Sequence, residues 1–69
     1  MSYKLKEMKT INLIKKLIKL EFRQDKISLS EITDSATAYL LLCDKKFKSV
    51  NDRLELAYHS RLMEICMLD

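Results

Sequence analysis

The chain has 69 residues, of which 48% are hydrophobic and 33% are charged, and its formal net charge at pH 7 is +3. It contains no glycine and no proline, the two residues that supply positive or fixed φ angles in tight turns. Because a β-rich domain needs many such turns, the composition argues against a β fold and predicts an all-α protein. It also excludes sites built on glycine-rich loops, such as a phosphate-binding loop.

The length limits the chain to a single domain. A domain of this size buries only about 60% of the surface that its unfolded form exposes, so its own core is marginally stable. The two cysteines, Cys43 and Cys66, are far fewer than in a secreted disulfide scaffold, which favours reduced thiols and a cytoplasmic location. We expect no signal peptide, since lysines interrupt the first apolar stretch. We also expect no membrane span, which needs ~20 apolar residues.

Apolar residues at helical spacing predict a first helix over about residues 2–23. Its apolar residues form two adjacent stripes, which are Met8, Ile11, Ile14, Ile18 and Phe22, and Leu13, Leu17 and Leu20. Together the stripes cover roughly 240° of the helix, far more than the ~100° that faces a single core. We therefore expect apolar surface to remain for self-association or for a stable partner.

Two serines predict where the next helices begin. Ser28, with Glu31 three residues later, has the spacing of a capping box and predicts a helix over about residues 29–46. Ser49 and Asp52 repeat the spacing and predict a third helix over about 50–67. The predicted core stripes are Leu29, Ile32, Ala36, Leu40, Cys43 and Phe47 in the second helix, and Val50, Leu54, Ala57, Tyr58, Leu62 and Ile65 in the third.

The predicted architecture is a small antiparallel bundle of three helices. The segment that joins the second and third helices contains neither glycine nor proline. One long continuous helix, which would give a long helical hairpin, therefore remains an alternative.

Catalytic and metal-binding patterns are weak. His59, the only histidine, shares a helix face with Glu55 and Cys66, whose side chains can bind zinc, but the spacing matches no zinc signature. Cys66 lies about 10 Å of axial rise from His59, too far for a hydrogen-bonded pair, and Cys43 falls on a predicted core stripe. We therefore expect an exposed His59 beside Glu55, no metal, no cofactor and no catalytic residue. The protein is predicted not to be an enzyme.

Surplus apolar residues are the strongest functional signal. The candidate partner-binding residues are Leu13, Ile14, Leu17, Leu20, Leu41, Leu42, Leu56, Met63 and Met67. Apolar helix faces that contain methionine suit helix-on-helix recognition. They predict a small protein-binding module, such as a regulator, adaptor or co-chaperone, that acts through its helix faces as a homodimer or a hetero-complex.

Four lysines of the first helix support an alternative function. Lys9, Lys15, Lys16 and Lys19 form a basic stripe that suits phosphates or an acidic protein. This predicts a nucleic-acid-associated regulator, but no aromatic residue lies among the lysines to stack on bases. Binding of the first helix to a membrane surface is a weaker alternative, because two capped helices follow it. No small-molecule substrate is expected.

Overall fold

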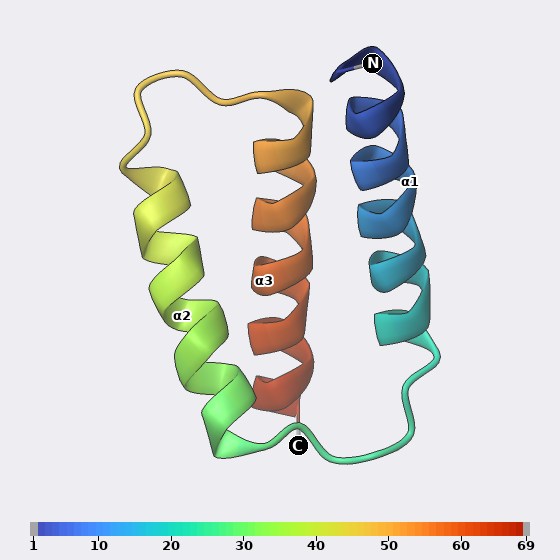
Figure 1. The fold of residues 1–69 in the computed structure, drawn as a ribbon. Coiled ribbons are helices and arrows are strands. Elements are labelled where there is room, and N and C mark those ends of the chain that lie inside the picture. Colours follow the sequence, from blue (N-terminus) through green and yellow to red (C-terminus); the bar gives the residue numbers. More distant parts are fainter. Residues whose placement is uncertain (1, 69) are drawn as a thin grey trace.

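A computed structural model describes the backbone of residues 2–68 and the side chains of residues 9–68. It contains three helices, α1 (Ser2–Glu21), α2 (Leu29–Cys43) and α3 (Val50–Leu68), and the described residues form no strand. Consecutive helices run in opposite directions, and α3 lies between the other two (Figure 1). The predicted all-α bundle of three helices is confirmed.

Both predicted serine caps are present. The Ser28 hydroxyl accepts a hydrogen bond from the Glu31 backbone N–H at 3.2 Å, and the Glu31 carboxylate accepts one from the Ser28 N–H at 3.3 Å. Ser49 and Asp52 make the same reciprocal bonds, at 3.1 and 3.0 Å. These bonds satisfy N–H groups that a helix start leaves unpaired, so they define where α2 and α3 begin. The alternative of one continuous helix is wrong, because a connection separates α2 from α3.

The helix ends differ from the prediction. α1 ends at Glu21 and α2 at Cys43, before the predicted ends near residues 23 and 46, whereas α3 continues to Leu68. Beyond α1, the Arg23 N–H bonds to the Leu20 carbonyl at 3.3 Å, which tightens the last turn. α1 and α2 end early because polar side chains of the two connections pair with residues of the helices that follow, which holds the connecting backbone outside the helix.

The core lies where α3 contacts both neighbours. No Cα atom of α1 lies within 8 Å of a Cα atom of α2 among the described residues, so the two outer helices pack on α3 and not on each other. Among the side chains of residues 9–68, the buried apolar ones are one leucine from each helix: Leu20, Leu42 and Leu62, which are 4%, 8% and 2% exposed. The arrangement is therefore an open array of helices, and each outer helix is covered on one side only.

The core stripe predicted for α2 is mostly wrong. Leu29 and Leu40 are 79% and 67% exposed, whereas Ser35 is buried and bonds to His59 of α3. A serine occupies this contact because its small side chain allows close helix approach and its hydroxyl finds a partner there. Cys43 and Phe47, also predicted for the core, are exposed, and Ile32 and Ala36 are half-buried.

The core stripe predicted for α3 is partly correct. Leu62 is the most buried residue of the described chain, and Leu54, Tyr58 and Ile65 are half-buried. Val50 and Ala57 are instead exposed. On α1, Leu13, Leu17 and Leu20 face α3, whereas Ile11, Ile14, Ile18 and Phe22, which we call the isoleucine stripe, are exposed. Met8, predicted for the same stripe, lies outside the described side chains. The open array explains both results, because no fourth element covers the far sides of the helices.

Candidate functional site

Two contacts between α1 and α3 lie on either side of the row of α1 residues that faces α3, so they define two flanks of α1. The Lys16 ammonium lies 5.0 Å from the centroid of the Tyr58 ring, and the Glu21 carboxylate accepts a hydrogen bond from Arg61 Nε at 2.7 Å. Five residues correspond to about 140° around a helix, so the two contacts lie on opposite flanks. The isoleucine stripe lies on the same flank of α1 as Glu21. The lysines that line surface hollows, Lys9 and Lys19, lie on the same flank as Lys16.

We call the side of the array with the isoleucine stripe the outer face. Its residues are Ile11, Ile14, Ile18 and Phe22 of α1, Leu29, Ala36, Leu40 and Cys43 of α2, and Val50, Arg53, Ala57, Ser60, Glu64, Met67 and Leu68 of α3. Its large apolar side chains are between 44% and 86% exposed. Monomeric proteins rarely expose contiguous apolar patches of more than a few hundred Å². The outer face is therefore the strongest functional candidate.

The opposite side of the array carries charges of both signs. One hollow there is lined by Lys9 and Lys16 of α1 together with Asp52 and Glu55 of α3. Since the carboxylates of α3 share the hollow with the lysines of α1, the two signs offset each other there. Lys15 and Lys19 are exposed and line no part of it. A second hollow on this side is lined by Lys16, Lys19 and Arg23 and by no carboxylate. Three of the four predicted lysines thus line this side of the array, and Lys15 lines neither hollow.

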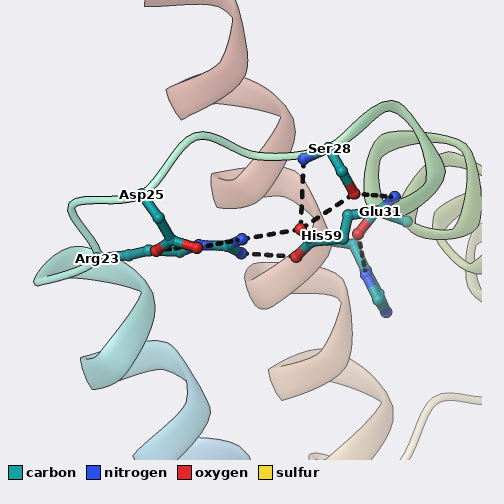
Figure 2. A network of polar contacts seen from close by, with 6 residues as sticks. Arg23, Asp25, Ser28, Glu31 and His59 are labelled. Carbon is teal, nitrogen blue, oxygen red and sulfur yellow. Dashed lines mark hydrogen bonds and ion pairs between the residues drawn. The ribbon is translucent and has the colours of Figure 1, made fainter.

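Arg23 joins the end of α1 to the start of α2 (Figure 2). Its guanidinium donates to the Asp25 carboxylate at 2.9 Å and to the Glu31 carboxylate at 2.6 and 2.8 Å. The hydrogen bond from Arg23 lowers the pKa of Glu31 to about 2, and the bond from the Ser28 backbone adds to this effect. The network holds the connection between the helices and is a structural element, because all its charged groups are paired with one another.

His59 is half-buried and not exposed as predicted. Its Nδ1 atom lies 2.9 Å from the Ser35 hydroxyl, with which it shares a hydrogen bond, and its ring meets the Tyr58 ring edge-on at 5.2 Å. Burial lowers the pKa of His59, the Glu55 charge raises it, and the Lys16 charge lowers it. Ser35 is only 3% exposed, so its hydroxyl packs between helices and does not reach solvent as a nucleophile would.

The pKa of His59 predicts that acid destabilises the fold. The unfolded chain takes up the proton near the ordinary value of 6.5, whereas the folded chain does so only at lower pH. The unfolded state therefore binds more protons as pH falls below 6.5, and the free energy of unfolding decreases. Urea unfolding at a series of pH values from about 7.5 to about 5.5 measures this loss. His59→Gln should flatten the profile, and an equally steep profile in that variant would contradict the assignment.

The described residues hold no group of three His, Cys, Asp or Glu side chains placed to bind a metal ion. Within this part of the chain both cysteines are free thiols, with Cys43 exposed and Cys66 half-buried. Among the described residues, His59 shares its side-chain hydrogen bond with Ser35 and with neither cysteine. The charged and polar clusters thus account for local structure, and the outer face carries the unpartnered surface.

The candidate partner-binding residues fall into three groups. Leu20 and Leu42 are buried, so they belong to the core and are unavailable to a partner, which corrects the prediction. Four others are half-buried in the array, namely Leu13, Leu17, Leu56 and Met63. The exposed members are Ile14, Leu41 and Met67.

The prediction assigned several outer-face residues to a core, notably Leu29, Leu40 and Val50. The one sequence signal for such a surface was the overwide apolar arc of α1, which indicates that one of its two stripes lies outside the fold.

The chain matches no protein-family model, no curated protein and no solved structure. Among the described residues, no helix has the length and apolar character needed to cross a membrane.

Proposed function

We propose that the protein is a non-enzymatic protein-binding module that acts through its outer face. The observation that carries this proposal is the isoleucine stripe of α1, where Ile11, Ile14 and Ile18 are 44–54% exposed in a row along one flank. Covering each of these side chains stabilises a complex by a fraction of the ~1.5–3 kcal/mol that full burial provides. A regulator, adaptor or co-chaperone works by this kind of reversible contact. We expect it to act in the cytoplasm, with its thiols reduced.

A nucleic-acid-associated regulator has less support. Binding to phosphates needs cations that are free to approach the backbone of the nucleic acid. Lys16 lies over the Tyr58 ring, and Lys9 shares its hollow with Asp52 and Glu55. The apolar outer face is also left without a role in that function, whereas a protein partner would cover it.

Photo-crosslinking in the native cell tests the proposal. Benzoyl-phenylalanine replaces Ile18 on the outer face in one variant and Asp34, an exposed residue of the opposite side, in a matched control. We expect discrete adducts with protein from position 18 and none, or far fewer, from position 34. Circular dichroism confirms that both variants are folded. An absence of protein adducts at position 18, or equal adducts from both positions, would contradict the proposal.

A further inference from the structure

The exposed ridge of α3 runs along the centre of the outer face. Its residues follow at helical spacing and are all exposed: Val50, Arg53, Ala57, Ser60, Glu64 and Met67. In order, they are apolar, basic, small, small, acidic and apolar. When two copies of this ridge lie antiparallel, an apolar residue lies opposite an apolar one, an acid opposite a base, and a small residue opposite a small one. The ridge is therefore complementary to an antiparallel copy of itself.

We propose that the outer face binds a second copy of this chain, with the two α3 helices antiparallel about a two-fold axis between Ala57 and Ser60. The inference rests on the proposed function and names its partner. In a two-fold interface each contact occurs twice. Arg53 pairs with Glu64 of the partner subunit, and Val50 packs against Met67 of the partner subunit.

The ridge is suited to close packing at its middle and to ion pairs on either side. Ala57 and Ser60 lie at the axis, where small side chains let two helices approach to the lower end of the 8–10 Å range. Arg53 forms no ion pair within the described residues 9–68, and Glu64 pairs only with Arg61 of its own helix, at 2.7 Å. The dimer gives each Arg53 guanidinium a carboxylate partner.

The same two-fold axis also brings α1 and α2 opposite their copies in the partner subunit. Lys16 lies against Tyr58, and Ser35 bonds to His59, so the axis passes α1 near Lys16 and α2 near Ala36. Near this level on α1, Ile14 and Ile18 lie beside the axis and pack against Ile14 and Ile18 of the partner subunit. On α2, Ala36 lies opposite its own copy. Apolar residues thus meet apolar residues on all three helices.

The apolar area available matches the needs of a dimer. A large apolar side chain buries on the order of 150 Å² when fully covered, and the nine on the outer face are 44–86% exposed. Covering them completely removes roughly 900 Å² per copy, comparable with the ~800 Å² per partner of a standard interface. A chain this short with free cysteines gains the stability that small domains otherwise take from disulfides.

The charges of the ridge favour a second copy over a lipid surface. Arg53 and Glu64 lie among the apolar residues of the outer face. Acyl chains offer no partner for the Glu64 carboxylate, and burying an unpaired charge costs free energy. A second copy satisfies both charges at once, because each subunit supplies the base and the acid.

A charge-reversal series measured by sedimentation equilibrium of the full chain tests the proposal. We expect wild type to be dimeric at micromolar concentration. Arg53→Glu and Glu64→Arg should each weaken the dimer by about tenfold or more, because each places two like-charged pairs across the axis. The double variant R53E/E64R should return to near the wild-type constant. Mixing the two single variants should give a heterodimer, in which both pairs are opposite in sign.

Lys9→Glu is the matched control, since it makes the same charge change on the opposite side of the array. It should leave the dimer constant unchanged. A monomeric wild type, or a dimer indifferent to Arg53→Glu, overturns the proposed arrangement. Such a result is separate from failure of the proposed function, because position 18 would then crosslink to a different protein. Circular dichroism shows whether every variant keeps its helix content.

Discussion

Leu62→Ala is expected to lower the free energy of unfolding by about 2–5 kcal/mol, the range for leucine truncation in a packed core. Leu62 is 2% exposed and belongs to the one helix that contacts both of its neighbours. A cavity there weakens the packing of α1 and of α2 together. Because small domains are stable by only about 5–15 kcal/mol, this single change removes a large share of the stability. Urea unfolding followed by far-ultraviolet circular dichroism measures the loss.

Leu41→Ala is the control for this experiment. The same atoms are removed from a helix, but Leu41 is 67% exposed, so we expect a change within about 0.5 kcal/mol. Similar losses from both variants would mean that the core does not lie at the junction of the three helices.

Ser35→Leu is expected to destabilise the fold by about 1–3 kcal/mol through overpacking, although it makes α2 more hydrophobic. Ser35 is 3% exposed between α2 and α3, and its hydroxyl bonds to His59. A leucine side chain there forces the helices apart and leaves His59 Nδ1 without its partner. Thermal and urea unfolding of the purified variant measure the effect.

Two further serine variants separate these causes. Ser35→Ala removes only the hydrogen bond and should cost about 0.5–1.5 kcal/mol. Ser30→Leu adds the same bulk at an exposed position of α2 and should change stability little. If Ser35→Leu were instead stabilising, α2 would pack through the stripe of Leu29 and Leu40, and the assignment of its faces would be wrong.

Helix starts were predictable from local sequence, whereas helix ends were not. Ser28 and Glu31 lie three residues apart, and their mutual hydrogen bonds require nothing beyond that short segment. The end of α1 depends on Arg23, whose side chain bonds to Glu31 eight residues away. Without glycine or proline, the chain has no local residue that stops a helix.

The faces of the helices were harder to predict, for a physical reason. Hydrophobicity ranked Leu29 and Leu40 above Ser35 as core residues of α2. The contact was decided by size and by a hydrogen bond to His59, which lies 24 residues away. Sequence periodicity describes one helix at a time and contains no information on such a partner.

The sequence predicted that an apolar stripe of α1 remains exposed, but not which residues form it. The width of the apolar arc of α1 correctly implied a stripe left outside the fold. It did not distinguish the leucines, which face α3, from Ile14 and Ile18, which remain exposed. Only the position of α3 makes that choice.

The central position of α3 also determines the order in which the fold can form. Lys45, in the connection between α2 and α3, bonds to Asp52 seven positions away, and Ser35 of α2 bonds to His59 across 24 positions, whereas Glu21 meets Arg61 across 40 positions. Since contacts between residues that are near in sequence form faster, we expect the α2–α3 hairpin to form first and α1 to dock onto it. During synthesis, α1 leaves the ribosome first, yet its docking surface is completed last. The leucines and isoleucines of α1 are therefore exposed throughout synthesis, when a newly made chain most needs protection from aggregation.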